Sequence, residues 1–352
     1  MKTQFPLIPR LVIFVSIACT SDLATTVNAQ SVSFYQGKNI RIITSDSSGG
    51  GYDRWSRLFA SHMRKYIAGN PAIIVQSMPG AGGRVAANYV YGVAKPDGLT
   101  LLMASRYLAM DQLVGSKDIG YDVRKFNWIG SPSKESLVLI MRADAPYKSM
   151  EDIIKAKEPP KCGDVGTSSS GYQLAKLLEE TVGARINVVL GYADIGLVDL
   201  AVERGEIVCR GQPVQSHFTR EPHMSWDKRN FDRHIVQTGR TRDTRMAEVP
   251  TIYELMDQYK TPDVSRRVAQ VILSGPEFGY PMVAAPAIPG EQLKILRAAY
   301  SSVLKDVDFL VEIKKLRLEL NPSTAEELQN SAAEVVGQPT EVVERVRKLL
   351  ND

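Results

Sequence analysis

The sequence predicts an α/β protein with two successive domains, in which strands are followed by small-residue loops and helices. Three observations support this prediction. Strand and helix patterns alternate over the first hundred residues after the N-terminal segment, and a second series with the same alternation begins near residue 162. The length of 352 residues suits about two domains. Hydrophobic residues make up 44% and charged residues 23%, which is typical of a globular chain with a sizeable core.

The N-terminal residues 1–29 are predicted to be a signal peptide. Lys2 and Arg10 precede an apolar run over residues 11–18, and small residues around Ala29 provide a cleavage site. The apolar run is shorter than the roughly 20 residues that a membrane-spanning helix needs. We therefore expect the mature chain to be exported. Cys19 leaves open the alternative of a lipid anchor.

The first strand and helix series supplies three strands. Residues 39–44 read as a strand, and an amphipathic helix follows from Asp53, which we expect to cap it. A second strand over 72–76 and a second helix over 85–93 repeat the unit, and residues 100–105 supply a third strand. This order is typical of parallel strands covered by helices.

The second series repeats this order. Strands are predicted at residues 162–166, 186–190 and 206–210, and helices begin near Tyr172 and Leu197. Two apolar strands at residues 137–141 and 281–285 are placed to run between the domains. We therefore predict a discontinuous first domain over residues 30–138 and 275–352, and a second domain over residues 139–274.

Two cysteines, Cys162 and Cys209, remain after signal cleavage. In an oxidising compartment they can pair, and closing that loop would stabilise the fold by roughly 4 kcal/mol in the chain-entropy model. Two buried thiols are the alternative.

Small-residue loops at the ends of predicted strands are the candidate binding sites. SDSSGGG (residues 45–51), PGAGG (79–83) and GTSSSG (166–171) each follow a strand and precede a helix. Glycines let the backbone approach a ligand, and helix N-termini offer N–H donors to an anion. Arg106, just after the third strand, can pair with a carboxylate or remain a surface arginine. For any single loop, a simple strand-to-helix turn is an equally good explanation.

Several other chemistries find no support in the sequence. The phosphate loop GxxxxGK[ST] is absent, Val85 occupies the third small position of a dinucleotide motif, and Ser170 interrupts GxSxG. His217, Glu221 and His223 lack a helical spacing that would gather a metal ion. Basic residues between 220 and 245 are mixed with acidic ones, which does not favour nucleic acid. We predict no catalytic residue, metal or cofactor.

The chain resembles the Bug family, the extracytoplasmic solute receptors of tripartite tricarboxylate transporters. The resemblance covers nearly all of the mature chain. It rests mainly on IRIITSDSSGGGYDRWSRLFA (residues 40–60) and IIVQSMPGAGGRVAANYVYGVAKPDGLTL (73–101), and further on the GTSSSG loop, GYADIGLVDLAVERGEIV (191–208), VPTIYE (249–254) and VAAP (283–286).

The resemblance implies a two-lobed periplasmic binding protein of type II topology, with two strands crossing the hinge and a carboxylate ligand between the lobes. The candidate ligand-binding residues are Ser47, Ser48, Gly49, Gly50, Gly51, Gly80, Ala81, Gly82, Gly83, Ser105, Arg106, Thr167, Ser168, Ser169, Tyr192 and Gln212. Asp46 adds a negative charge to the first loop, so we expect it to point away unless the ligand is less anionic. Tyr192 is followed by Ala193 where many relatives have a lysine, which makes a monocarboxylate the safer expectation than a dicarboxylate.

The sequence therefore predicts a monomeric periplasmic receptor that passes a small organic carboxylate to the membrane subunits of a tripartite tricarboxylate-type transporter, or reports it to a sensor. Two alternatives come from other classes of protein. One is an exported hydrolase or transferase that uses the serines at 168–170, and the other is a structural envelope protein without a ligand.

Overall fold

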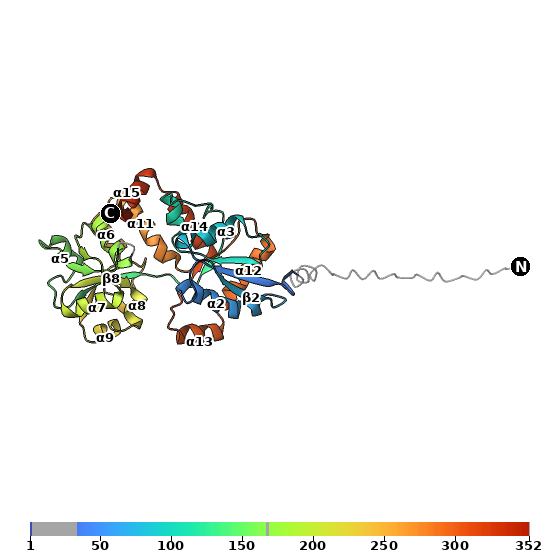
Figure 1. Cartoon of the computed structure of the whole chain (residues 1–352), viewed down its shortest axis with the longest axis horizontal. Coiled ribbons are helices and arrows are strands. Elements are labelled where there is room, and N and C mark those ends of the chain that lie inside the picture. Colours follow the sequence, from blue (N-terminus) through green and yellow to red (C-terminus); the bar gives the residue numbers. More distant parts are fainter. Residues whose placement is uncertain (2–33, 167–168, 352) are drawn as a thin grey trace.

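The computed structural model describes residue 1, residues 34–166 and residues 169–351. Cys19 and the rest of the predicted signal peptide after Met1 lie outside the described residues, as do Thr167 and Ser168. Two lobes, each built on one β-sheet, lie side by side along the long axis of the molecule (Figure 1). Within the described part of the chain, no helix is long and apolar enough to cross a membrane.

The first lobe contains a six-stranded sheet with the order β11-β4-β10-β3-β1-β2. Its strands are β1 (Asn39–Thr44), β2 (Ala72–Ser77), β3 (Thr100–Met103), β4 (Asn127–Ser131), β10 (Met282–Ala284) and β11 (Ser323–Thr324). Its helices are α2 (Gly51–Met63), η1 (Arg64–Tyr66), η2 (Ala81–Gly83), α3 (Arg84–Gly92), α4 (Leu108–Leu113), α12 (Gly290–Val303), α13 (Val307–Lys315) and α14 (Ala325–Val336). The three strands predicted in this region are confirmed, and β1 pairs in parallel with both β2 and β3.

The second lobe contains a five-stranded sheet with the order β7-β6-β8-β5-β9. Its strands are β5 (Leu137–Arg142), β6 (Lys161–Gly163), β7 (Asn187–Val189), β8 (Cys209–Pro213) and β9 (Asp232–Gln237). Its helices are α5 (Met150–Lys155), α6 (Ser170–Val182), α7 (Ile195–Arg204), α8 (Val214–Thr219), α9 (His223–Lys228), η3 (Thr244–Met246) and α10 (Ile252–Gln258).

The two sheets share one strand order. In each sheet, the strand that follows a crossing between the lobes runs antiparallel between the third and fourth strands of that lobe: β10 lies between β3 and β4, and β5 lies between β8 and β9. This repeated order agrees with the type II arrangement that the resemblance implies. The two-lobed α/β fold is thereby confirmed.

The crossings differ from the expectation in one detail. The strands predicted to run between the lobes each pair within a single sheet, as β5 and β10. The chain crosses first through residues 132–136, between β4 and β5, and returns through helix α11 (Asp263–Phe278). Apolar strands are fully buried in a sheet centre, so their composition reports burial rather than a position between lobes. The lobe boundaries at residues 138 and 274 stay predictions.

Helix α2 shows why the first loop is followed by a helix. Trp55, Leu58, Phe59 and Met63 are buried on one face, as the apolar spacing predicts. The N-cap residue is Gly50, so the prediction that Asp53 caps this helix by preceding it is wrong. Asp53 lies in the first turn, and its carboxylate accepts a hydrogen bond from the Gly49 N–H at 2.9 Å. Asp53 therefore anchors the end of the first loop through this hydrogen bond, from a position within the first turn of α2.

The two cysteines of the second lobe form a disulfide rather than remaining two buried thiols. Cys162 lies opposite Cys209 on the neighbouring parallel strands β6 and β8, and their sulfurs are bonded at 2.04 Å. The bond joins two strands of one sheet that lie 47 residues apart in sequence.

Helix α15 (Thr340–Asn351) contacts both lobes. The Arg345 guanidinium lies 2.8 Å from the Glu180 carboxylate in α6, and Arg347 donates to the Val114 carbonyl in the first lobe at 2.9 Å. Helix α15 also packs along α11, next to it at the top of Figure 1. The C-terminal segment thus reinforces the return crossing.

Candidate functional site

Three loops of the first lobe meet at the carboxyl ends of β1 and β3. A Cβ atom at Gly83 would lie 2.7 Å from the Ser105 Cβ and 3.0 Å from the Ser45 Cβ, closer than side chains approach. Gly83 also has a φ of +96°. Only glycine therefore fits here, and the PGAGG loop packs directly against the ends of both strands.

The backbone of the PGAGG loop explains its composition. Gly80, Ala81, Gly82 and Gly83 all have positive φ values, of 140°, 47°, 65° and 96°. Ala81 is the single non-glycine residue in this run, and its φ is unusual for a residue with a Cβ. The loop is thus a tightly turned backbone segment that ends at the start of α3.

The first loop already directs N–H groups at the chain's own carboxylates. Ser47 donates its N–H to Asp46 Oδ1 at 2.9 Å, and Gly49 donates to Asp53. A Cβ at Gly50 would lie 1.6 Å from Asp46 Oδ2, so the Asp46 carboxylate covers Gly50. Of the two alternatives for Asp46, the structure disfavours the one in which it points away, and the less anionic ligand stays a prediction. Ser47, Ser48 and Gly49 remain exposed.

Arg106 lies in a polar and aromatic cluster that reaches both interlobe crossings. Its guanidinium bonds Glu135 at 2.5 Å and Tyr52 Oη at 3.3 Å, and it stacks over the Tyr280 ring at 4.8 Å. Tyr280 also donates its hydroxyl to Glu135 at 3.1 Å. Burial opposes the charge of Arg106, but Tyr52 and Glu135 raise its pKa above the usual value, so it stays charged. Glu135 precedes β5 and Tyr280 follows α11, so the cluster joins the first lobe to both crossings.

Sequence reasoning missed Glu135 and Tyr280. No motif surrounds either residue, and each meets Arg106 only because the crossings bring distant segments together. The Arg106 prediction is therefore incomplete, because this cation already has a carboxylate partner within the chain.

The loop of the second lobe has an internal carboxylate at its helix start. Asp164 is buried, and it accepts hydrogen bonds from the N–H groups of Tyr172 at 3.0 Å and Val165 at 2.8 Å. Ser169 is the N-cap of α6, and its hydroxyl donates to the Gly166 carbonyl. Gly171 packs on Gly211 of β8, where a Cβ would lie 2.8 Å from the Gly211 oxygen. Asp164 was not singled out in the sequence, where it lies within the strand predicted at residues 162–166; in the structure it directly follows β6.

The remaining two candidates in the second lobe are placed differently. The Tyr192 ring lies against Gly163 and packs on the lobe's apolar core. Gln212 is 1% exposed and its amide contacts the His217 ring at 2.9 Å. Neighbouring residues of a strand point to opposite faces, so Gln212 points away from α6, on which Gly211 packs.

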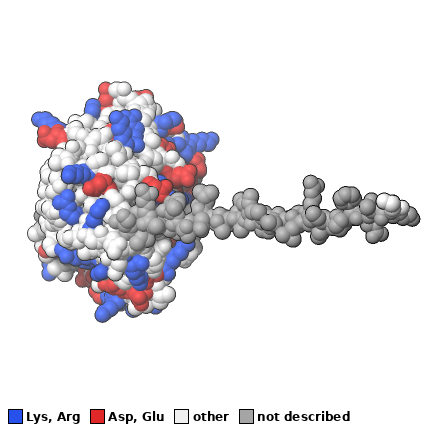
Figure 2. Space-filling model, turned by 90° about the vertical axis from the view of Figure 1, so that its right-hand side faces the viewer, with Lys and Arg blue, Asp and Glu red and all other residues white. Residues whose placement is uncertain are grey.

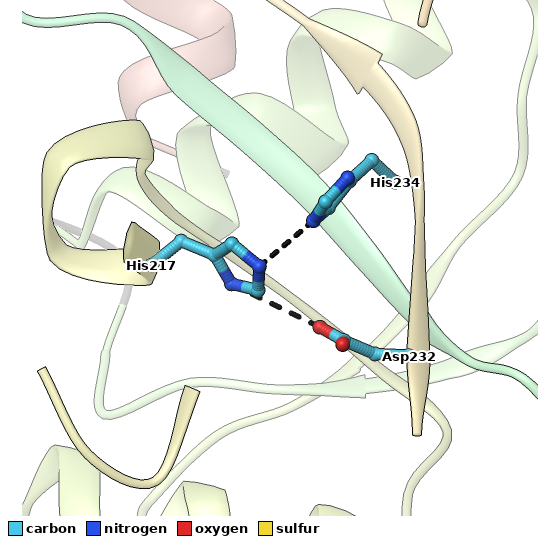
Figure 3. Close-up of side chains that lie close together, drawn as sticks. All are labelled: His217, Asp232 and His234. Carbon is cyan, nitrogen blue, oxygen red and sulfur yellow. Dashed lines mark hydrogen bonds and ion pairs between the residues drawn. The ribbon is translucent and has the colours of Figure 1, made fainter. Parts of the chain in front are cut away.

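A histidine cluster lies beside Gln212. His217, Asp232 and His234 come together, with the two His Nε2 atoms 2.7 Å apart and His217 Nδ1 3.8 Å from Asp232 Oδ2 (Figure 3). Burial lowers the pKa of His217 to about 3 and raises the pKa of Asp232 to about 7. Burial also lowers the pKa of His234. His223 instead contacts Asp199, and Glu221 accepts a hydrogen bond from Ser225, so neither residue joins this cluster.

A hollow of about 540 Å³ is bordered by both interlobe crossings. Its lining includes Lys134, Glu135, Arg240, Glu277, Asn321 and Glu334. None of the predicted ligand-binding residues lines this hollow.

On the face of the first lobe shown in Figure 2, Lys and Arg side chains are mixed with Asp and Glu side chains, which is typical of a solvated mixed-charge surface.

The sequence pattern of one protein family matches most of the chain. The family is described as "Tripartite tricarboxylate transporter family receptor", and the match covers residues 56–345. Two curated relatives are similar over shorter stretches. A UPF0065 protein in the gbd 5' region of Cupriavidus necator is 33% identical over 159 residues, which is 45% of this chain and 47% of that protein. A UPF0065 protein of Bordetella bronchiseptica is 34% identical over 103 residues, which is 29% of this chain and 30% of that protein. The chain thus spans about half or less of the curated relatives it matches.

Solved structures share the fold at low sequence identity. A TctC solute-binding protein from Polaromonas, without ligand, is 19% identical with a TM-score of 0.71, covering 90% of this chain and 99% of that one. An R. palustris protein with adipate is 17% identical with a TM-score of 0.56, covering 90% and 98%. MatC from Rhodopseudomonas palustris with bound malate is 18% identical with a TM-score of 0.53, covering 87% and 99%.

Proposed function

We propose that this chain, which belongs to the tripartite tricarboxylate transporter receptor family, is a periplasmic receptor for a small organic carboxylate. The proposed site lies between the lobes, at the first-lobe loops over residues 45–51, 79–83 and 105–106 and at the start of α6 in the second lobe. The receptor delivers its solute to the membrane subunits of a tripartite tricarboxylate-type transporter or reports it to a sensor. We expect it to act as a monomer.

The observation that carries this proposal is the meeting of three small-residue loops beside a charged arginine. Ser45, Gly83 and Ser105 pack together at the strand ends, and the neighbouring residue Arg106 is held by Tyr52 and Glu135. A guanidinium offers several donors in one plane, which suits a carboxylate. In parallel α/β sheets, ligands bind beyond such strand ends.

The carboxylates within the loops indicate how anionic the solute is. Asp46 covers Gly50, Glu135 bonds Arg106, and Asp164 occupies the start of α6. A dicarboxylate would meet a like charge at each of its ends, whereas a monocarboxylate can use Arg106 with its single anionic end. The proposal therefore favours a solute with one carboxylate and an uncharged or cationic remainder. The malate and adipate of the two solved structures belong to those proteins and serve here as probes.

The energetics require no covalent chemistry. Micromolar affinity corresponds to about 8 kcal/mol. Charge-assisted hydrogen bonds contribute roughly 1.5–3 kcal/mol each, so a few contacts with Arg106 and backbone N–H groups are sufficient. Hinge closure would then bury the solute.

The family consists of receptors that bind solutes, not of enzymes. The alternative of an exported hydrolase that uses the serines at 168–170 is therefore not supported.

The experiment is a thermal-shift screen of the exported chain against monocarboxylates, amino acids and dicarboxylates, including malate and adipate. Binding to the folded state alone raises the melting temperature with ligand concentration. The best ligand is then tested on Arg106→Gln and on the control Arg240→Gln. Arg240 is a good control because it likewise bonds a glutamate, Glu277, and stacks on a tyrosine, Tyr253.

We expect the Arg106 variant to lose the shift and the Arg240 variant to keep it. Equal responses in both variants would exclude Arg106 from the site. No shift with any compound would favour the structural envelope protein.

A further inference from the structure

We propose that His217, Asp232 and His234 form a binding site for a divalent transition-metal ion of the zinc class. The site lies within the second lobe and is independent of the carboxylate site. Figure 3 shows the two imidazoles and the carboxylate pointing toward one another from α8 and β9.

The backbone places the three groups together. Asp232 and His234 are separated by one residue on β9, so their side chains share one face of this strand. His217 lies on α8 and points at the same face, and its side chain is 0% exposed. One ligand atom from each residue lies within 4.8 Å of the others.

The carboxylate lacks a partner that would explain its burial. The Asp232 side chain is 1% exposed, and neither of its oxygens has a hydrogen-bond donor among the described residues. A buried carboxylate without a donor is costly, and this cost is relieved when a cation binds. Asp232 Oδ2 lies 3.8 Å from His217 Nδ1, so the carboxylate stands beside the imidazole whose Nε2 would hold the shared cation.

Gln212 supplies the support that a metal-bound histidine needs. Its amide lies 2.9 Å from His217 Nδ1, and its oxygen has no partner among the described residues. The oxygen and nitrogen of an amide are assigned from the hydrogen-bond network, so turning the amide over places the oxygen at this contact. Gln212 then accepts from Nδ1–H, which leaves the His217 Nε2 lone pair free for a metal.

The donor set selects the class of ion. Two imidazole nitrogens and one carboxylate oxygen suit zinc and neighbouring transition metals, whereas calcium and magnesium prefer oxygen ligands alone. Tetrahedral zinc with bonds of about 2.0–2.1 Å separates its ligand atoms by roughly 3.3 Å. The two Nε2 atoms, now 2.7 Å apart, must therefore open by roughly 0.6 Å, which rotation of the partly exposed His234 side chain can provide.

The site has a route to solvent. A hollow of about 550 Å³ is lined by Asp232 and His234. Its other charged lining residues are Glu151, Asp227 and Glu248 of negative charge, and Lys148, Arg233 and Arg245 of positive charge. Three protein ligands leave the fourth position of the metal open to water from this hollow.

The test is metal binding by the exported chain, purified without a histidine tag and treated with a chelator. Co²⁺ is the spectroscopic probe, because a tetrahedral site gives intense visible d–d bands, and Zn²⁺ is the competitor. We expect one equivalent of Co²⁺ to bind, Zn²⁺ to displace it, and Zn²⁺ to raise the melting temperature.

Two ligand variants and one control localise the site. His234→Gln and Asp232→Asn are expected to weaken Co²⁺ binding at least tenfold. His62→Gln is the matched control, because His62 also contacts a carboxylate, Glu312 at 2.7 Å, but lies in the first lobe.

Two results would overturn the proposal. The first is substoichiometric Co²⁺ binding by the folded parent, which would leave the cluster as a metal-free hydrogen-bond network. The second is unchanged binding by His234→Gln, or an equal loss in His62→Gln, which would place the metal elsewhere. If Asp232→Asn fails to fold, the parent and His234→Gln still decide the question.

Discussion

The contact between Glu135 and Arg106 provides a sharp test of the proposed carboxylate site. The substitution Glu135→Gln keeps the size of the side chain and an oxygen that can accept from Arg106, but it removes the negative charge. If the Arg106 guanidinium receives the solute's carboxylate, Glu135 competes for the same cation. We therefore expect the substitution to tighten binding, which is the opposite of what loss of a ligand contact would do.

The size of the effect follows from the geometry. Arg106 Nη1 lies 2.5 Å from Glu135 Oε2, so a second carboxylate on the free side of the guanidinium would lie roughly 6 Å from Glu135. Two like charges at that separation repel by about 3 kcal/mol at an effective dielectric of 20 and by about 0.7 kcal/mol in water. Both side chains are largely but not fully buried, so we expect about 1–2 kcal/mol. This corresponds to a dissociation constant about 5- to 30-fold lower.

Isothermal titration calorimetry with the best ligand from the thermal-shift screen measures this change. Glu277→Gln is the matched control, since Glu277 contacts Arg240 at 3.0 Å and accepts from Tyr253 at 2.9 Å, in the same kind of cluster. We expect it to leave the affinity unchanged. Weaker or unchanged binding by Glu135→Gln would refute the assignment of Arg106 to the ligand.

Three further predictions concern the loops and the stability of the fold. Asp46→Asn removes the negative charge over Gly50, so we expect carboxylate affinity measured by calorimetry to rise several-fold; a fall would mean that Asp46 contacts a cationic part of the solute. Replacing both Cys162 and Cys209 by alanine should lower the free energy of unfolding by roughly 4 kcal/mol in urea titrations, and thiol titration of the denatured, unreduced parent should find both cysteines blocked. Burial opposes the charge of Asp306, but hydrogen bonds from Lys65 and Tyr66 lower its pKa to about 2. Because the folded pKa lies below the unfolded one, its stabilisation is present above about pH 4 and is lost as the pH falls toward 2. Because one pKa unit corresponds to about 1.4 kcal/mol, the stability difference between the parent and Asp306→Asn, roughly 2 kcal/mol at neutral pH, should shrink over that interval; a constant difference would contradict it.

Local patterns predicted much of the fold. The strand at residues 39–44 and the buried face of α2 follow from apolar spacing, which is a property of neighbouring residues. The PGAGG loop was recognised because positive φ values require glycine, which is also a local property. The placement of β5 and β10 was not predictable in the same way, since a buried apolar run does not reveal its sheet partners.

The candidate site was predicted in part, for the same physical reason. The lobe-one loops do meet, but Glu135 reaches Arg106 through the crossing, 29 residues away in sequence. Asp232 and His234 carried a usable signal, because an i, i+2 spacing in a strand places both on one face. His217 joins them only through the packing of α8 on the sheet.

The central claim is that this chain holds a small organic carboxylate and leaves it unchanged. The most direct measurement is mass spectrometry of the small molecules released when the freshly purified, exported chain is denatured. We predict one dominant compound that carries a carboxylate, is recovered intact after rebinding, and gives a concentration-dependent thermal shift. Release of a compound without a carboxylate, or its chemical conversion on incubation with the protein, would contradict the account.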